Sequence, residues 1–155
     1  LSATLRRAGI EDLPALAALN LRLHELHVAG APERYRRVGV VELEAHLRSM
    51  LAREDVEIGL LGEGAGYIVI IVQDRAESPL TFGARVLYVD QLGVHPDRRG
   101  VGAGRALMDW AAERARALGC VRIELDVAGF NEEARGFYEA LGYRLRQTRF
   151  ECVLL

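Results

Sequence analysis

Hydrophobic residues recur along this chain with two different spacings, and each spacing predicts its own kind of element. Between residues 12 and 28 the apolar positions follow one another at three or four residues, which places them on one face of a helix. The same spacing returns in three later stretches, two of which end at a glycine, a residue that commonly closes helices. The predicted helices cover residues 12–28, 40–53, 104–118 and 131–141.

Strands are predicted where apolar residues alternate with polar ones or run together. Residues 121–127 alternate, as a strand with one buried face does, whereas residues 68–72 are apolar throughout, which indicates that both of their faces are covered. The predicted strands cover residues 4–8, 56–61, 67–72, 85–94, 121–127 and 143–153. Strands and helices in this order predict one α/β domain over residues 1–155, with a mixed sheet and helices on both faces.

The composition is that of an ordinary globular domain, and it argues against nucleic acid and membrane as partners. Of the 155 residues 50% are hydrophobic and 27% charged, and the formal net charge is −2, so the basic excess of a general nucleic-acid binder is missing. No apolar run approaches the ~20 residues of a membrane span, and the first residues lack the layout of a signal peptide. We therefore expect a cytoplasmic protein without a membrane partner. Cys120 and Cys152 are expected to be buried free thiols rather than a disulfide.

A glycine-rich segment between Arg99 and Arg105 has the chemistry of an anion site. Gly100, Gly102 and Gly104 let the backbone curl so that several N–H groups converge on one point. This point lies at the start of a predicted helix, whose dipole also favours negative charge there. The two arginines add charged donors at the rim. The plain alternative is a flexible surface turn.

Two other phosphate-binding loops do not fit this segment. A P-loop requires Gly-Lys-Ser/Thr, but Gly104 is followed by Arg105 and Ala106. The dinucleotide fingerprint Gly-x-Gly-x-x-Gly fails as well, because its last glycine position holds Arg105 in one register and Leu107 in the other. The segment is therefore expected to bind its anion as neither a P-loop nor a dinucleotide-binding loop.

The pattern Arg-x-x-Gly-x-Gly that begins at Arg99 resembles the acetyl-CoA signature of the GNAT superfamily of N-acetyltransferases. Residues 92–102 are similar to that family's fourth strand and turn, and Asn131 with residues 137–143 is similar to its last conserved block. The opening, residues 5–13, is a weaker match. The resemblance implies a mostly antiparallel sheet of about six or seven strands that splays between its fourth and fifth strands.

The resemblance also implies that acetyl-CoA is the co-substrate, with its pantetheine arm in the splay and no metal. An amide of Leu92 or a neighbour would polarise the thioester carbonyl. Gly93 suits a close backbone approach, although a plain bulge explains it equally well. Asn131 would hydrogen-bond the pantetheine, cap the helix that begins there, or do both. The residues implied for coenzyme binding are Leu92, Gly93, Val94, Arg99, Gly100, Val101, Gly102, Ala103, Gly104, Arg105 and Asn131.

Tyr138 and Asp90 are the residues expected to move protons. By resemblance Tyr138 is the general acid, and a phenol with a pKa of ~10 is a suitable donor to a thiolate whose thiol has a pKa of ~8.5. Its plain alternative is a core aromatic residue. Asp90, two residues before Leu92 and expected on the same strand face, is the candidate general base for the amine. Glu124 and Asp126 are alternative bases, although a solvated strand face explains both as well.

The acceptor side is expected in the first helix and the loop after it, where the resemblance places the acceptor site. The candidates are His24, His27 and Tyr35, joined by Asp126 from the fifth strand. The plain alternative for the histidines is ordinary exposure on a helix. Protein N-termini, lysines, polyamines, aminoglycosides and amino acids all stay open as acceptors, and so does an acyl group other than acetyl.

The favoured hypothesis is an N-acetyltransferase in which an amine attacks acetyl-CoA directly in a ternary complex. Neither cysteine lies in the predicted site, which disfavours a covalent route. A non-catalytic CoA-binding sensor or assembly module is the alternative, and an unrelated nucleotide-binding α/β protein is a third. The apolar residues 150–155 suit either an internal strand or pairing with a second copy in a homodimer.

Overall fold

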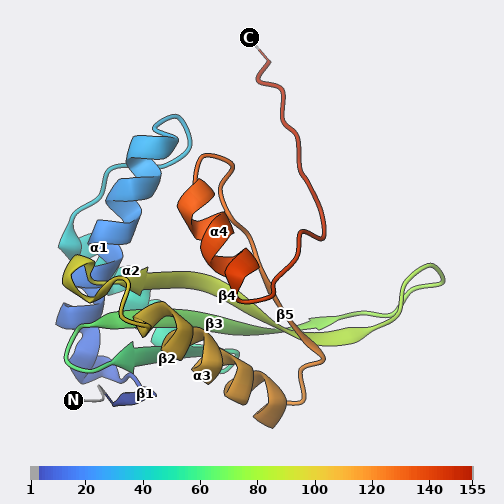
Figure 1. Ribbon diagram of the computed structural model, residues 1–155, viewed down its shortest axis with the longest axis horizontal. Coiled ribbons are helices and arrows are strands. Elements are labelled where there is room, and N and C mark those ends of the chain that lie inside the picture. The colour runs from blue at the N-terminus through green and yellow to red at the C-terminus, as the bar shows by residue number, and fades with distance from the viewer. Residues whose placement is uncertain (1–3, 155) are drawn as a thin grey trace.

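Five strands form one mixed sheet between two layers of helices (Figure 1). The structure, a computed structural model, describes residues 4–154. The strands lie in the sheet in chain order and comprise β1 (Leu5–Arg7), β2 (Val56–Leu61), β3 (Gly66–Arg75), β4 (Ala84–Val94) and β5 (Arg122–Leu125). Neighbouring strands from β1 to β4 are antiparallel, whereas β5 is parallel to β4 and is reached through a helical crossover.

The helices cover both faces of this sheet. They comprise α1 (Leu13–Gly30), α2 (Val40–Leu51), α3 (Ala103–Ala117) and α4 (Glu132–Ala140), with short 3₁₀ turns at Ile10–Asp12 and Pro96–Arg98. α1 and α2 pack on one face, and α3 and α4 pack on the other. All four predicted helices are confirmed, with bounds that shift by about two residues at most. Within residues 4–154, no helix combines the length and the apolar character that crossing a membrane requires.

The sheet is buried on both sides because β3 alternates between two cores. Tyr67, Val69 and Ile71 face α1 and α2. Ile68 and Ile70 face α3 instead. None of the five is more than 8% exposed, which confirms that both faces of this apolar run are covered.

The strand expected over residues 143–153 is wrong, and the sheet has five strands rather than about six or seven. Tyr143 packs on Tyr138 at a ring-centroid distance of 5.9 Å, but residues 144–154 are exposed and pair with no described strand. β5 is also shorter than the strand predicted over residues 121–127. An apolar alternation marks a segment suited to a sheet, but a ladder also needs a neighbouring strand, which the pattern does not specify.

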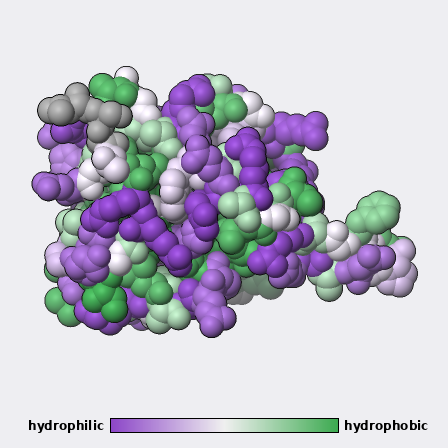
Figure 2. Space-filling model, turned by 90° about the horizontal axis from the view of Figure 1, so that it is seen from below, coloured by the Kyte–Doolittle hydropathy of each residue, from purple (hydrophilic) through white to green (hydrophobic). Residues whose placement is uncertain are grey.

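A hairpin between β3 and β4 projects from the body of the molecule. β3 continues to Arg75, so the turn begins later than the sequence predicts. Leu80 and Phe82 near its tip are 94% and 95% exposed. Figure 2 shows the tip standing clear of the remaining surface, with apolar residues at its end. Isolated apolar side chains of this kind are normal on protein surfaces.

Gly93 is required by packing, and a substitution tests this. A Cβ atom at Gly93 would lie 2.5 Å from a ring carbon of Tyr67, which is 0% exposed. We expect Gly93→Ala to lower the free energy of unfolding by about 1–3 kcal/mol, because the core there has no space for a methyl group. The measurement is urea unfolding, with circular dichroism as the probe.

Gly136→Ala is the matched control for this substitution. Gly136 lies within α4, and nothing lies within 4 Å of the Cβ that alanine would add. Alanine should therefore leave the free energy of unfolding unchanged or raise it by up to about 1 kcal/mol through its better helix propensity. Equal stability of the two variants would contradict the packing requirement at Gly93.

Candidate active site

β4 and β5 separate part-way along the sheet, and one edge of β4 is left free. β5 pairs with residues 86–89 only, although β4 continues to Val94. Among the described residues, 90–94 therefore have no strand partner on the β5 side. The predicted residues Leu92, Gly93 and Val94 lie on this edge, and the separation begins at Asp90, slightly before the expected position. Backbone groups at such an edge need partners, so the edge suits an extended ligand that carries amides.

A β-bulge at Asp90 changes which side chains face which layer. Val69 pairs with Gln91 and Ile70 pairs with Val89, so Asp90 has no partner on β3. Because the bulge inserts one residue, Val89 and Leu92 both face α3. Burial raises the pKa of Tyr67 and of Tyr88, and the charge of Asp90 raises both further; the two tyrosines face α1 and α2. The expectation that Asp90 and Leu92 share a face is therefore wrong.

A buried hydrogen-bond network ties the bulged part of β4 to α1. The Asn20 side-chain amide donates to the Tyr67 hydroxyl at 2.8 Å and to the Gln91 side-chain oxygen. The Tyr67 hydroxyl donates to the same Gln91 oxygen at 2.8 Å. Burial raises the pKa of Tyr67 and keeps it a neutral donor. The sequence analysis did not predict this network. One indication was present, because Asn20 is a polar residue at an apolar position of the first helix.

Carboxylates and tyrosines gather at the splay on the side of α1. The Tyr88 hydroxyl donates to Asp126 Oδ2 at 3.0 Å. Burial raises the pKa of Tyr88, and the charges of Asp126 and Asp90 raise it further, so its hydroxyl stays protonated. Tyr35 also raises the pKa of the Tyr88 hydroxyl, by the smallest of these contributions. Asp126 therefore contacts Tyr88 directly, and Asp90 is near enough for its charge to act on the pKa of the same hydroxyl.

Glu124, one of the alternative bases, is occupied by arginines. Its carboxylate accepts from Arg75 and Arg122, each at 2.7 Å, and lies 3.5 Å from Arg146. Burial raises the pKa of Glu124, but the arginines outweigh it, so the pKa is lowered overall. A carboxylate held in this way is a poor proton acceptor, and Asp90 and Asp126 remain the candidates.

The three acceptor-side candidates from the first helix and its loop, His24, His27 and Tyr35, form one aromatic cluster. The rings of His27 and Tyr35 lie 5.1 Å apart, and those of His24 and Tyr35 lie 6.3 Å apart. His24 Nε2 is 2.6 Å from the carbonyl oxygen of Arg36, which fixes the loop against the helix. Burial lowers the pKa of His27, so this ring is neutral near pH 7. Val28 and residues 32–37 line a hollow beside the cluster.

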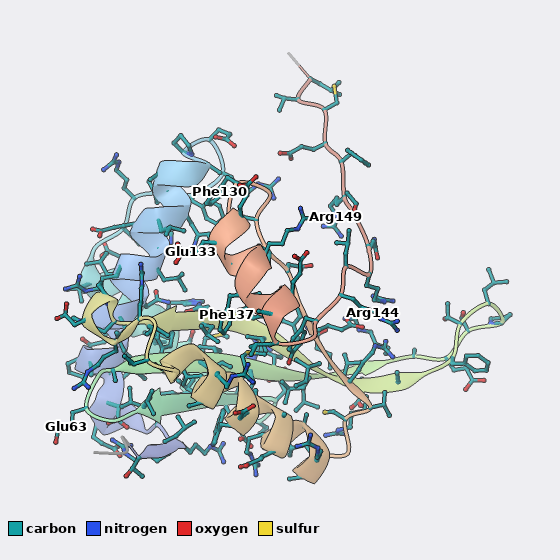
Figure 3. The ribbon with its side chains drawn as sticks, in the orientation of Figure 1. Glu63, Phe130, Glu133, Phe137, Arg144 and Arg149 are labelled. Atoms are coloured by element: carbon teal, nitrogen blue, oxygen red, sulfur yellow. The ribbon has the colours of Figure 1, made fainter. Side chains whose placement is uncertain are left out.

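Phe130 closes the site on this side and was not identified from the sequence. Figure 3 labels Phe130 near the end of α1, and its ring lies 6.2 Å from that of His27. It also covers Gly30, where a Cβ atom would lie 2.3 Å from the ring. The end of α1 and the loop before α4 are thus joined across the site. A lone aromatic residue in a loop carries no periodicity, so the sequence offered no signal for this contact.

The glycine turn forms a cradle of backbone donors at the start of α3. Gly100 and Gly102 have φ angles of +74° and +89°, a region that favours glycine. The N–H groups of residues 100–105 donate no hydrogen bond to any described residue. Arg99 and Arg105 are exposed at the rim. Free amides at a helix N-terminus with nearby arginines fit the diphosphate of a coenzyme.

Gly104, by contrast, is explained by the packing of α4 on α3. A Cβ atom there would lie 2.9 Å from the ring of Phe137, whose place on α4 Figure 3 shows. Of the three glycines of the turn, Gly100 and Gly102 therefore allow its left-handed backbone conformation. The third lets α4 approach α3 closely.

α4 carries the predicted acid and begins with the predicted cap. The Asn131 side-chain oxygen accepts from the Ala134 N–H at 3.1 Å, which confirms the helix cap. Tyr138 packs on Phe137 and Tyr143, and burial followed by the neighbouring Tyr143 raises its pKa to about 12. Its hydroxyl bonds to no described residue. Tyr138 packs against the core on the α3 side, and Asp90 lies at the bulge where β5 separates from β4.

Residues 16–143 match the acetyltransferase (GNAT) family, a range that includes the splay, the glycine turn and Tyr138. The chain belongs to the GNAT acetyltransferase family. The GNAT domain is also similar to the mycothiol acetyltransferase of Beutenbergia cavernae, with 50% identity over 52 residues. That match covers 34% of this chain and 18% of the relative's length.

Solved structures share the architecture of this GNAT domain. A mutant of the BH1408 protein from Bacillus halodurans matches with a TM-score of 0.90 and 26% identity, covering 98% of this chain and 99% of that chain. An aminoglycoside N-acetyltransferase in complex with CoA matches with a TM-score of 0.73 and 16% identity, covering 96% of this chain and 95% of that chain. The second match is one of fold alone. The predicted fold class is confirmed.

Proposed function

We propose that this GNAT domain transfers an acetyl group from acetyl-CoA to a primary amine, by direct attack within a ternary complex. The observation that carries the proposal is the free edge of β4 followed directly by the amide cradle of the glycine turn. An extended arm with amides, ending in a diphosphate, matches both features. The CoA complex of the aminoglycoside N-acetyltransferase of the same fold supports this choice of donor.

The residues of the coenzyme site divide into two groups. Leu92, Gly93 and Val94 offer backbone groups to the pantetheine, and the Asn131 amide nitrogen is free to add a further hydrogen bond, because its cap uses the oxygen. The cradle at the start of α3 binds the diphosphate. Its members are Arg99, Gly100, Val101, Gly102, Ala103, Gly104 and Arg105.

Three groups perform the chemistry around the splay. Asp90, exposed at the bulge, accepts a proton from the incoming ammonium, directly or through water. An N–H of β4 at or beside Leu92 donates to the thioester oxygen as charge develops there. The Tyr138 hydroxyl donates its proton to the departing sulfur. The burial that holds the pKa of Tyr138 at about 12 keeps this proton in place until it is needed.

The acceptor enters from the side of α1. His24, His27 and Tyr35 form its aromatic wall, and Asp126 and Asp90 supply negative charge where an ammonium would arrive. This arrangement suits a small-molecule, polyamine or protein amine.

The test of the donor site is calorimetric titration with acetyl-CoA. We expect Gly102→Ala to weaken binding about 10-fold, because a left-handed conformation costs a non-glycine residue about 1–2 kcal/mol and the relaxed turn no longer aims its amides. Val101→Ala is the control in the same turn. Its side chain is 72% exposed, so its affinity should stay within about two-fold of wild type. No binding by the wild-type chain, or equal binding by all three proteins, would exclude the cradle.

A thiol-release assay with a panel of amines then tests the transfer itself. Turnover of at least one primary amine is expected. Tight binding of acetyl-CoA without turnover on small amines, polyamines or peptides would contradict the proposed reaction while leaving the donor site intact.

A further inference from the structure

The side-chain amide of Gln91, on the free edge of β4, is held at its oxygen and free at its nitrogen. The oxygen accepts from the Asn20 side-chain amide and from the Tyr67 hydroxyl, the latter at 2.8 Å. Two donors on one oxygen fix the orientation of this amide. The nitrogen, Nε2, donates to no residue that the structure describes.

This nitrogen is accessible, although the groups that hold the amide are buried. Asn20 and Tyr67 are 4% and 0% exposed, whereas Gln91 is partly exposed. Among the described residues, every buried side-chain nitrogen or oxygen has a hydrogen-bond partner, so a nitrogen without one is open to solvent. A donor fixed by a buried network loses little freedom when a ligand oxygen binds to it.

The bulge places this donor beside Asp90. Gln91 pairs with Val69, whose side chain faces α1 and α2, so Gln91 faces the same side. Asp90 is the residue that the bulge inserts directly before Gln91, and its side chain is exposed. The bulge breaks the alternation that sends adjacent side chains of a regular strand to opposite faces. Because the Cα atoms of adjacent residues lie about 3.8 Å apart, one small group can meet the carboxylate and the amide together.

A carboxylate beside an amide N–H matches one kind of amine. The carboxylate attracts the ammonium of the acceptor, and the N–H donates to an oxygen close to that ammonium. Such an oxygen is present when the carbon that bears the amine is bonded to a carbonyl group, as in an amino-acid amide or at the N-terminus of a peptide. A lysine side chain or a polyamine has only methylene groups there and would leave the donor without a partner.

We propose that Gln91 selects acceptors in which a carbonyl group is bonded to the carbon that bears the amine. This assignment rests on the proposed acetyl transfer, whose acceptor it narrows. The carbonyl belongs to an amide or a peptide, because the carboxylate of a free amino acid would lie beside Asp90 and be repelled. Asn20 and Tyr67 are positioning residues, which act through the Gln91 oxygen.

A titration with two amines tests the assignment without any turnover. The isotope-labelled full chain is saturated with CoA, so that no acetyl group is present, and NMR spectra are recorded as the amine is added. One amine is alaninamide, and the other is its alkylamine analogue, in which an isopropyl group replaces the carboxamide. At about pH 6.5 both are ammonium ions. The side-chain NH₂ signal of Gln91 should shift several times further with alaninamide than with the analogue.

Gln91→Glu removes the donor and keeps the oxygen that Asn20 and Tyr67 require. The fold should therefore persist, which thermal unfolding checks. We expect the affinity for alaninamide to fall about 10-fold relative to that for the analogue, the effect of one lost hydrogen bond. The ratio cancels the effect that a new negative charge has on both ammonium ions. In the thiol-release assay, kcat/KM for the two amines should show the same change of ratio.

Gln73→Glu is the matched control for this substitution. It makes the same chemical change on β3, where the Gln73 oxygen accepts from Arg75, and the ratio should stay as in wild type. Tyr67→Phe removes one of the two donors that hold the Gln91 oxygen. It should lower the ratio about 3-fold while the affinity for the analogue is unchanged, which a general loss of stability would not produce.

Two results would overturn the assignment. One is a Gln91 NH₂ signal that alaninamide leaves in place. The other is a ratio that Gln91→Glu leaves unchanged, or that Gln73→Glu changes as much. Failure of the acetyl transfer is recognised separately, because the NH₂ signal would then shift with alaninamide while no thiol is released.

Discussion

Replacing Tyr138 with phenylalanine is expected to lower kcat about 100-fold, while the KM for acetyl-CoA changes little. The substitution removes one hydroxyl and keeps the ring packed on Phe137 and Tyr143, so the fold should be unaffected. What is lost is the proton for the departing thiolate. Steady-state kinetics with the best amine of the panel would measure the effect, with thermal unfolding as the check on stability.

The pH dependence of kcat separates the role of Tyr138 from a structural one. An acid works while it is protonated, so its contribution is lost as the pH rises through its pKa, which burial raises to about 12 here. Wild-type kcat should therefore show no alkaline decline from Tyr138 below about pH 10, and the Tyr138→Phe deficit should persist from about pH 7 to 10.

Tyr143→Phe is the matched control for this prediction. Tyr143 is partly buried, and its ring lies 5.9 Å from that of Tyr138. The substitution removes the same group, a phenolic hydroxyl. Its kcat should stay within about two-fold of wild type. Should Tyr138→Phe keep wild-type kcat, the thiolate leaves without help from this residue.

Asp90→Asn is expected to lower kcat/KM about 100-fold at about pH 7 and less than about 10-fold at about pH 10. An amine acceptor with a pKa of ~10.4 is almost entirely protonated at the lower pH and needs a base, whereas at about pH 10 much of it is already the free amine. Asparagine has nearly the shape of aspartate, so the bulge should persist. The measurement is kcat/KM across this pH range.

Two further carboxylates complete the test of the base. Asp126→Asn should have the smaller effect, because Asp126 is already engaged by the Tyr88 hydroxyl. Asp74→Asn, on the projecting hairpin with its side chain 71% exposed, should leave kcat/KM unchanged. An Asp90→Asn deficit of the same size at both pH values would show that Asp90 positions the bulge rather than accepting a proton.

The parts of this molecule that depend on near neighbours in the chain could be predicted. The helices follow from apolar spacing over a few turns, and the glycine turn follows from residues in immediate succession. Gly100 and Gly102 do adopt positive φ angles, as a turn of converging amides requires. The Asn131 cap likewise depends on one residue and the first turn of the helix after it.

The parts that depend on distant segments could not be predicted. The bulge at Asp90 is a register shift between β3 and β4, and the residues of β4 alone look like one regular strand. The network of Asn20, Tyr67 and Gln91 joins three elements. Residues 143–153 were predicted as a strand because their composition suits one, whereas strand pairing depends on a neighbour that the described chain does not provide.

The glycine turn also limits which substitutions this protein can accept during evolution. Its donors are main-chain groups, so the exposed side chain of Val101 adds little to anion recognition. The positive φ angles of Gly100 and Gly102, however, exclude almost every other residue. Descendants of this sequence should therefore exchange Val101 freely and retain the two glycines. A change of coenzyme preference would then require a new backbone path rather than new side chains.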